Sequence, residues 1–301
     1  MDKPFQKMAV VGTGFLGTQI ALLSAYSGYK VCIYDIREGA FDQTYDRLFK
    51  DFKAKGINPV IPWDKWGAVK KSILFTTDLA RAVDDVDLVV EAVTEDVNVK
   101  RKVFRDVGKL APAKTIIATN SSSMPVSKME KSSGRPERCI NTHFYLPLQG
   151  MYMVDLMGGT KTLPEVIQKG DEWIRSLGCL PLRVNKEILG FCFNNVWRAI
   201  KRQVLFMWGN GYVDLRDVDR AWRIFTGTKF GPFGLMDTVG LDVIWDIEMV
   251  YYKDSKDPKD KPPKALKDKI KRGELGVKTG KGFYTYPNPE YLDPDFLNPK
   301  K

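Results

Sequence analysis

The chain has 301 residues, a net charge of +10, 44% hydrophobic residues and 28% charged residues. This composition excludes the disordered and fibrous classes, and the length suits two globular domains. The apolar runs are short and broken by charge, which excludes a transmembrane helix, and the N-terminus leaves no room for a signal peptide, so we expect a cytoplasmic protein.

The distribution of charge and of metal-ligating residues narrows the function further. Residues 253–272 hold nine basic and four acidic residues, and a second basic run extends from Lys50 to Lys71. Such charge attracts anionic small molecules as readily as nucleic acid, and no basic motif with interleaved aromatics favours nucleic acid. With one histidine and no CxxC pair we expect no metal site, and we interpret the four cysteines as small buried apolar residues.

A glycine-rich segment follows the first apolar run of the chain. Residues 8–11 are apolar, and GTGFLG after them has the spacing G-x-G-x-x-G. Phe15–Ser27 has the pattern of a helix, and Tyr29–Tyr34 that of a buried strand, which ends at Asp35. This order of strand, glycine loop, helix, strand and acid predicts a dinucleotide-binding unit rather than an unrelated glycine turn.

Each glycine of this unit allows a conformation or a close contact that a side chain would prevent. Gly12 permits the tight turn, Gly14 allows the backbone to approach a pyrophosphate, and Gly17 allows the helix to pack closely on the strand. The helix that begins at Phe15 and Leu16 presents free N–H groups to the phosphates.

The acid after the second strand indicates which dinucleotide binds. Asp35 would accept hydrogen bonds from an adenosine ribose and would repel a 2′-phosphate, so the sequence favours NAD over NADP. Ile36 and Arg37 follow it, and the charge of Arg37 weakens this preference.

Further strands alternate with helices along the N-terminal part of the chain. We expect strands at Ile73–Thr76, Asp87–Ala92, Thr115–Thr119, Cys139–Phe144, Met151–Leu156 and Leu180–Val184, and helices at Glu38–Lys55, Asp78–Val83 and Glu95–Leu110. This alternation predicts an α/β Rossmann-type doubly wound sheet, which binds ligands outside the carboxyl ends of its strands. The polar residues expected at these ends are Asp35, Glu91, Asn120 and His143.

Two glutamates in the segment VVEAVTED need separate interpretation. Glu91 could line the cofactor site, and so could Glu95, although acids are also favoured in the first turn of a helix, where we expect Glu95. The predicted cofactor-binding residues are Gly12, Gly14, Phe15, Leu16, Gly17, Asp35, Ile36, Arg37, Glu91, Glu95, Asn120 and Ser122.

The pattern changes after Gly190. Helices are expected at Phe191–Asn210, Asp214–Phe225, Gly234–Tyr252 and Pro263–Arg272, and no strand period is visible. We therefore predict an NAD-binding domain of residues 1–187 and an all-helical substrate and dimerisation domain of residues 188–301. The first long helix carries more apolar surface than a small domain buries, which favours a homodimer.

The only histidine, His143, is the candidate proton-transfer residue. Histidine ordinarily titrates near neutrality, and this one lies between the hydroxyls of Ser121–Ser123 and the carboxylate of Asp155, twelve residues further on. Taken alone, a single histidine near an apolar strand is more typical of a packed residue, so its interpretation depends on the rest of the chain.

Six segments in chain order resemble the L-3-hydroxyacyl-CoA dehydrogenase family and span almost the whole sequence. VVGTGFLG resembles its glycine fingerprint, TNSSS its Thr-Asn-x-Ser-Ser segment, and THFYLP its His-Phe-Phe-Asn-Pro motif. GFCFNN resembles the Gly-Phe-x-x-Asn-Arg that opens the helical domain. DVDRAW with GTKFGPFGLMDTVGLD resembles the Asp-x-Asp and Gly-Pro-Phe segments, and GVKTGKGFYTY resembles the terminal Lys-Thr-Gly-x-Gly-Phe-Tyr.

The resemblance implies an NAD-dependent dehydrogenase of fatty acid metabolism that interconverts a 3-hydroxyacyl-CoA and its 3-ketoacyl-CoA. It implies that His143 is the general base and acid, and that Asp155, where the family has glutamate, fixes the imidazole. It further implies that Ser122 and Asn194 hydrogen-bond the reacting oxygen. The basic run Lys50–Lys71 matches the helical arm that meets the CoA phosphates.

The chain also departs from the family motifs. Leu146 replaces an asparagine, Lys229 and Phe230 replace Pro-Met, and Asn195 replaces an arginine. The resemblance therefore leaves two alternatives: the same chemistry on a free 3-hydroxy acid or related carboxylate, as in gulonate-, carnitine- or diketo-acid-type relatives, or a structural protein like the lens crystallins that resemble this family.

Overall fold

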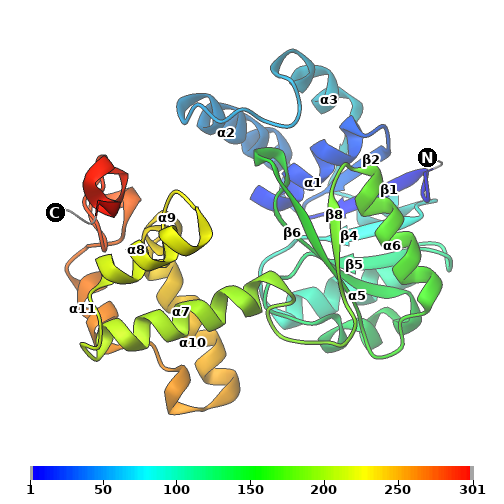
Figure 1. Cartoon of the computed structure of the whole chain (residues 1–301). Helices are drawn as coiled ribbons and strands as arrows, with labels where there is room; N and C mark the ends of the chain where they lie inside the picture. The colour runs from blue at the N-terminus through cyan, green and yellow to red at the C-terminus, as the bar shows by residue number, and fades with distance from the viewer. Residues whose placement is uncertain (1–2, 299–301) are drawn as a thin grey trace. The chain divides into compact units, whose positions relative to one another are not determined.

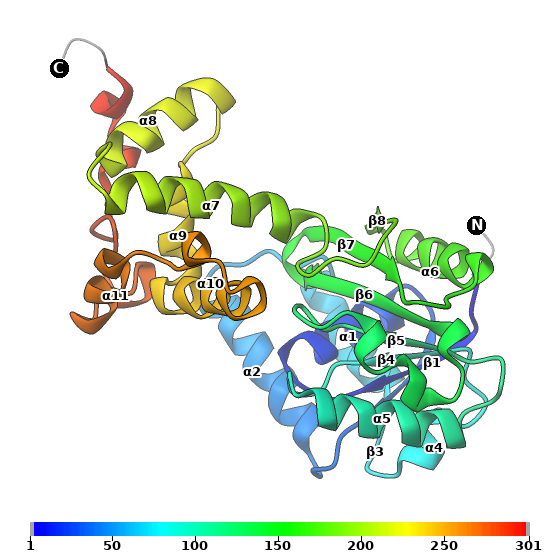
Figure 2. The same cartoon turned by 90° about the horizontal axis from the view of Figure 1, so that it is seen from below.

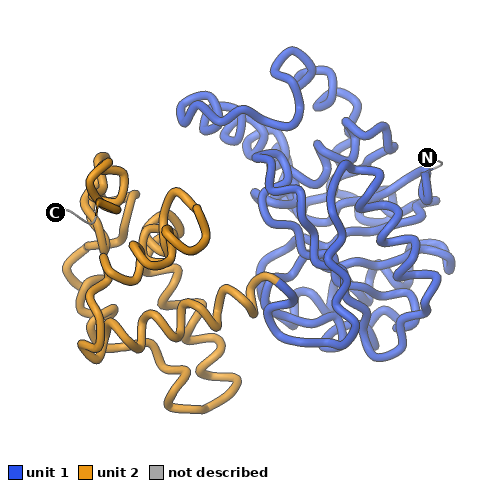
Figure 3. Tube along the Cα trace, in the orientation of Figure 1, with its two compact units in different colours: residues 1–192 blue, residues 193–301 orange. Residues whose placement is uncertain are grey.

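The computed structural model describes residues 3–298, and the chain divides into two compact units, residues 1–192 and 193–301 (Figure 3). The sequence predicts this division between residues 187 and 188. The segment before Phe193 belongs to the first unit because Phe191 stacks on His143 and the N–H of Cys192 donates a hydrogen bond to Asp155.

The first unit is built on one sheet with the strand order β3-β2-β1-β4-β5-β6-β7-β8 (Figure 1). The strands are β1 Lys7–Val11, β2 Lys30–Tyr34, β3 Leu74–Thr76, β4 Leu88–Glu91, β5 Ile116–Thr119, β6 Cys139–Leu146, β7 Met151–Gly158 and β8 Leu180–Val184. All neighbouring pairs are parallel except β6 and β7, which are antiparallel. The predicted Rossmann-type doubly wound sheet is thus confirmed.

Helices cover both faces of this sheet (Figure 2). They are α1 Phe15–Tyr26, α2 Ala40–Ala54, α3 Trp66–Ser72, α4 Leu79–Val83, α5 Val97–Leu110 and α6 Pro164–Ser176. Residues of α1, α2, α3 and α6 form one core with one face of the sheet, and those of α4 and α5 form a second core with the other. The central strands β4 and β5 are fully buried and read as continuous apolar runs, as strands covered on both faces do.

Two of these helices were not predicted. The sequence analysis left the Pro-containing segment that holds α3 without an element, and it assigned none to α6. Proline occupies the first turn of α6, where its missing N–H costs no helical hydrogen bond, so this residue is compatible with a helix start.

The second unit is helical. It contains α7 Phe193–Gly209, α8 Leu215–Thr226, α9 Pro232–Val239, α10 Leu241–Ser255 and α11 Lys264–Lys271. The single helix predicted for Gly234–Tyr252 is wrong, because Gly240 adopts φ 103° and ψ 127° and separates α9 from α10. An L side chain rarely adopts this φ, so glycine permits the break.

Two buried aspartates fasten the helical unit together. Asp219 accepts hydrogen bonds from the N–H groups at the start of α9 and from the hydroxyl of Tyr284. Asp237 accepts hydrogen bonds from the N–H groups of Phe283 and Tyr284 and from the hydroxyl of Tyr286. Burial raises the pKa of both aspartates despite these bonds. These hydrogen bonds therefore join the segments of this unit that resemble the family motifs.

Between residues 3 and 298 no helix is long and apolar enough to cross a bilayer. Within the same range, no three histidine, cysteine or acidic side chains are grouped so that they could hold a metal ion. The expectation of four buried cysteines is confirmed for Cys139 and Cys179, but it is wrong for Cys32, which is half-buried, and for Cys192, which is exposed.

Candidate active site

The glycine loop between β1 and α1 packs against the end of β4. A Cβ atom on Gly12, where φ is 109°, would lie 2.6 Å from the carbonyl oxygen of Ala92. A Cβ atom on Gly17 would overlap the carbonyl oxygen of Gly12. Neither position has room for a side chain, so both glycines are required for the shape of the loop.

Gly14 faces open space instead. The nearest atom to a Cβ placed on Gly14 is 4.0 Å away, and no side chain caps the start of α1. The N–H groups of Phe15 and Leu16 open the helix beside this space. Free N–H groups at a helix N-terminus, together with the positive end of the helix dipole, bind phosphate oxygens. The loop therefore fits the pyrophosphate of a dinucleotide.

Asp35 lies at the end of β2 beside this loop. Its Oδ2 accepts hydrogen bonds from the N–H (3.1 Å) and hydroxyl (2.7 Å) of Thr13, and its Oδ1 accepts one from the N–H of Arg37 (3.1 Å). Partial burial raises the pKa of Asp35, but these hydrogen bonds and the Arg37 charge outweigh it and hold that pKa below its ordinary value. Next to this ionised carboxylate, Ile36 is 80% exposed.

A buried lysine that the sequence analysis did not identify binds glutamates at and after the end of β4. Lys100 on α5 is 1% exposed, and its Nζ lies 2.8 Å from Oε1 of Glu91 and 3.2 Å from Oε2 of Glu95. Glu91 also accepts hydrogen bonds from the hydroxyl of Thr119 and the N–H of Val93. The signal in the sequence was a lysine on the otherwise apolar face of this helix.

Glu95 holds the serine loop that follows β5. It precedes α5, which begins at Val97 with Asp96 as its cap, so its expected place in the first helical turn is wrong. Its Oε1 accepts hydrogen bonds from the hydroxyls of Ser121 and Ser123 and from the N–H of Ser123. Partial burial raises the pKa of Glu95, but the Lys100 charge and these hydrogen bonds outweigh this effect and hold the pKa below its ordinary value.

Ser122 is left available by these contacts. It lies between the two serines that bind Glu95, is exposed, and makes no hydrogen bond to any residue from 3 to 298. Asn120, at the end of β5, is buried, and its Oδ1 accepts a hydrogen bond from the N–H of Phe144. This bond fastens the start of the serine loop to the strand that carries His143.

His143 and Asp155 are brought together by strand register. They face each other in the antiparallel ladder between β6 and β7, and Nδ1 of His143 lies 3.1 Å from Oδ2 of Asp155. His143 is 4% exposed and Asp155 is fully buried. With its proton on Nδ1, the imidazole donates to Asp155 and keeps Nε2 free to accept a proton.

Two aromatic residues enclose the imidazole. The ring of Phe191 stacks on His143 with 5.0 Å between centroids and 12° between planes, and the ring of Tyr145 lies 4.5 Å away. Phe191 has φ 52°, a left-handed conformation that is rare for a residue with a side chain. The sequence analysis named neither residue as part of the site. Asn194, which it did name, lies in the first turn of α7 in the second unit.

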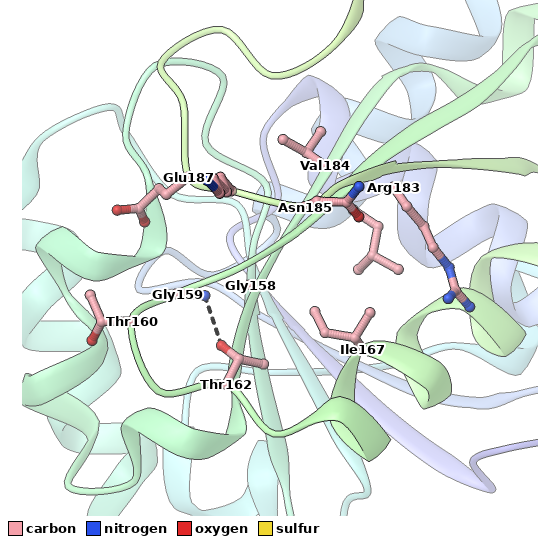
Figure 4. Close-up of a pocket in the computed structure, with 11 residues that line it drawn as sticks. Gly158, Gly159, Thr160, Thr162, Ile167, Arg183, Val184, Asn185 and Glu187 are labelled. Atoms are coloured by element: carbon pink, nitrogen blue, oxygen red, sulfur yellow. Dashed lines mark hydrogen bonds between the residues drawn. The ribbon is translucent and has the colours of Figure 1, made fainter.

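One cavity of the first unit lies away from these residues. It measures about 460 Å³ and is bordered by the end of β7, the loop after it and the segment after β8 (Figure 4). Gly158 at this end of β7 pairs with Ile140, near the amino end of β6. None of the predicted site residues lines it, so we assign the chemistry to the strand ends and not to this cavity.

Comparison with known proteins agrees with the loop and sheet geometry. The chain matches the model for the NAD-binding domain of 3-hydroxyacyl-CoA dehydrogenase over residues 7–188, and the model for that enzyme's C-terminal domain over residues 190–286. It is 30% identical over 284 residues to 3-hydroxybutyryl-CoA dehydrogenase of Clostridioides difficile, covering 93% of this chain and 99% of the relative.

Two further relatives act on other compounds. One is 5-formyl-3-hydroxy-2-methylpyridine 4-carboxylate 5-dehydrogenase of Mesorhizobium japonicum, 29% identical over 285 residues that cover 93% of this chain and 91% of the relative. The other is a solved diketoreductase structure, 36% identical with a TM-score of 0.85, which covers 95% of this chain and 100% of that one.

The fold and the glycine loop define an NAD-dependent dehydrogenase. The chain belongs to the 3-hydroxyacyl-CoA dehydrogenase family, as the sequence motifs predicted. It is an oxidoreductase that acts on a CH–OH group with NAD as its cofactor, so these two predictions are confirmed.

The buried ion pair at Lys100 makes a first prediction. Lys100→Met leaves Glu91 buried without its cation, which should lower the free energy of unfolding by about 3 kcal/mol in urea denaturation. Lys102→Met on the same helix removes only an exposed ion pair with Asp106 and should change stability little. Equal losses in the two variants would contradict the role of Lys100.

Asp35 makes a second prediction. Asp35→Ala removes the carboxylate that would repel a 2′-phosphate, so the preference for NADH over NADPH should fall at least tenfold in kcat/KM. Asp42→Ala, an exposed carboxylate on α2, should leave the preference unchanged. If Asp35→Ala keeps the wild-type preference, Asp35 only supports the loop through Thr13.

Proposed function

We propose that the protein interconverts a 3-hydroxyacyl-CoA and its 3-ketoacyl-CoA, with His143 as the general base in oxidation and the general acid in reduction. The observation that carries this proposal is the pairing of Nδ1 of His143 with Asp155, which leaves Nε2 for the substrate. NAD, when bound, accepts the hydride from the substrate carbon or returns it.

The residues around His143 suit proton transfer. A neutral imidazole takes the hydroxyl proton on Nε2, and the Asp155 carboxylate stabilises the cation that forms. Because both side chains are buried, solvent screens this attraction weakly. Phe191 covers one face of the ring and keeps it in the plane that meets Asp155.

Ser122 and Asn194 are proposed to hydrogen-bond the reacting oxygen. Ser122 is exposed and lies between two serines that bind Glu95, so its hydroxyl is available to a ligand. Donors aimed at a carbonyl oxygen stabilise the charge that develops on it when hydride arrives. Asn194 is proposed for the same role from the first turn of α7.

The loop geometry supports the following proposal for the cofactor-binding residues. The start of α1 at Gly14, Phe15 and Leu16 would hold the pyrophosphate, with Gly12 and Gly17 shaping the loop. Asp35 would hold the ribose, with Ile36 and Arg37 beside the adenine. Glu91, Glu95 and Asn120 would support or line the nicotinamide end through the serine loop. These roles extend the contacts described above.

The lysines of the basic run Lys50–Lys71 are relevant to the CoA part of the proposal. Lys50, Lys55 and Lys71 are exposed and form no ion pair with any residue from 3 to 298, so they are available to phosphates. Lys70 is engaged by Asp42 at 2.7 Å, and Lys53 lies over the ring of Trp63. Part of the basic run therefore remains free for an anionic group.

A free 3-hydroxy acid or related carboxylate is the second candidate substrate. Leu146 stands at the end of β6 where the family motif has asparagine, so this position offers an apolar contact in place of a hydrogen bond. The similarity to a diketoreductase and to a pyridine carboxylate dehydrogenase supports this candidate.

We also propose a homodimer formed through the helical unit. Val196 and Phe206 on α7 and Ile224 and Phe225 on α8 are exposed, with Phe225 92% accessible. The proposal is that these side chains form one contiguous apolar patch, the kind of surface that marks association. The expectation of a cytoplasmic enzyme of fatty acid metabolism stands with this proposal.

His143→Ala tests the proton-transfer role. Loss of the general base should reduce kcat by about 10²–10⁴-fold while the dissociation constant of NADH, read from its fluorescence, stays within about twofold. An alanine variant with at least half of the wild-type kcat would exclude His143 as the base.

A substrate comparison tests the CoA assignment. Acetoacetyl-CoA should oxidise NADH with a kcat/KM about tenfold or more above that of free acetoacetate, because the CoA phosphates add contacts with the exposed lysines. A higher kcat/KM with the free acid would replace the first candidate by the second.

A further inference from the structure

Asp155 is a junction of three hydrogen bonds and not merely the partner of His143. Its Oδ2 is 3.1 Å from Nδ1 of His143 and accepts a hydrogen bond of 2.7 Å from the hydroxyl of Tyr145. Its Oδ1 accepts a hydrogen bond of 3.2 Å from the N–H of Cys192. No atom of this carboxylate is exposed, so these donors determine its orientation.

Tyr145 reaches Asp155 because of its place on β6. His143 and Tyr145 are two residues apart on β6, whose pairing with β7 is irregular between Phe144 and Leu146, and the side chains of both reach Asp155. Asp155 lies directly opposite His143 on β7, within reach of both. The two rings are 4.5 Å apart between centroids, which places the tyrosine hydroxyl and the imidazole Nδ1 on one oxygen.

The lengths of the two bonds at Oδ2 show which donor holds the carboxylate more firmly. Charge-assisted N–H to carboxylate bonds are usually about 2.7–2.9 Å long, so the 3.1 Å contact with His143 is extended. Aspartate is also one methylene shorter than the glutamate of the family motif, so its carboxylate reaches less far from β7. The same motif has phenylalanine where this chain has Tyr145, so the two departures are in contact with each other.

We propose that Tyr145 is a positioning residue for the reaction: its hydroxyl holds the short Asp155 carboxylate beneath Nδ1 of His143. Tyr145 acts through Asp155 and does not touch the substrate. In oxidation, the imidazole takes a proton on Nε2 and becomes a cation that an oriented carboxylate stabilises best. Without the tyrosine hydroxyl, Asp155 loses its shortest hydrogen bond and can turn away from the ring.

This inference rests on the proposed role of His143, and a double-mutant cycle tests it. Tyr145→Phe in the wild-type background should lower kcat about tenfold and leave KM within twofold, because substrate contacts are intact. In an Asp155→Ala background, which is itself slow, the same change should alter kcat by less than twofold. If Asp155→Ala does not fold, Asp155→Asn supplies the second background and the same result is expected.

Tyr29→Phe is the matched control. Tyr29 is a buried tyrosine of the same unit whose hydroxyl also makes one short hydrogen bond, to Ser176. Its loss should lower the melting temperature as Tyr145→Phe does, without changing kcat. This comparison separates an effect of lost stability from an effect on the reaction.

The outcomes distinguish this inference from the function on which it rests. A tenfold loss of kcat in Tyr145→Phe that disappears without Asp155 supports the positioning role. If wild type is active, His143→Ala is inactive, and the kcat of Tyr145→Phe stays within twofold of wild type, the role of Tyr145 is overturned. The proposed function then stands. A loss of equal size in both backgrounds also overturns it. If wild type oxidises NADH with neither acetoacetyl-CoA nor free acetoacetate, both proposals are overturned.

Discussion

The antiparallel register of β6 and β7 is the constraint on which the candidate site depends. A shift of one residue would turn Asp155 to the other face of the sheet and leave His143 buried without its carboxylate. The register also determines which residues surround the pair, because the side chains of His143 and Tyr145 both reach Asp155. The sheet is parallel from β3 to β6, and its reversal at β7 is what brings a carboxylate beside the histidine.

Acidic side chains have two kinds of role in this protein. Asp219 and Asp237 in the helical unit accept main-chain N–H and tyrosine O–H groups, and they explain why the motifs of that unit occur together. In the first unit, Glu95 and Asp155 orient groups that are proposed to meet the ligand. The motifs that identify the family are therefore partly structural and partly chemical, and the departures at Leu146 and Asp155 concern the chemical part.

Much of the fold could be predicted because its signals are local. The glycine loop, the strand before it and Asp35 lie within one stretch, and apolar runs mark the buried strands. Contacts that depend on packing could not be predicted. The ion pair of Lys100 with Glu91 needs α5 to lie against β4, and the bond from Tyr145 to Asp155 needs the register of two strands. The break at Gly240 was missed because the apolar pattern continues through it.

The central claim is that Asp155 fixes the proton of His143 on Nδ1 and keeps Nε2 free for the substrate. Because the chain has one histidine, nitrogen NMR of untagged protein labelled with ¹⁵N-histidine gives the signals of this imidazole alone. At a pH where the ring is uncharged, we predict a protonated Nδ1 and an unprotonated Nε2, a preference that weakens in Asp155→Ala. A ring protonated on Nε2 in the wild-type protein would contradict the account.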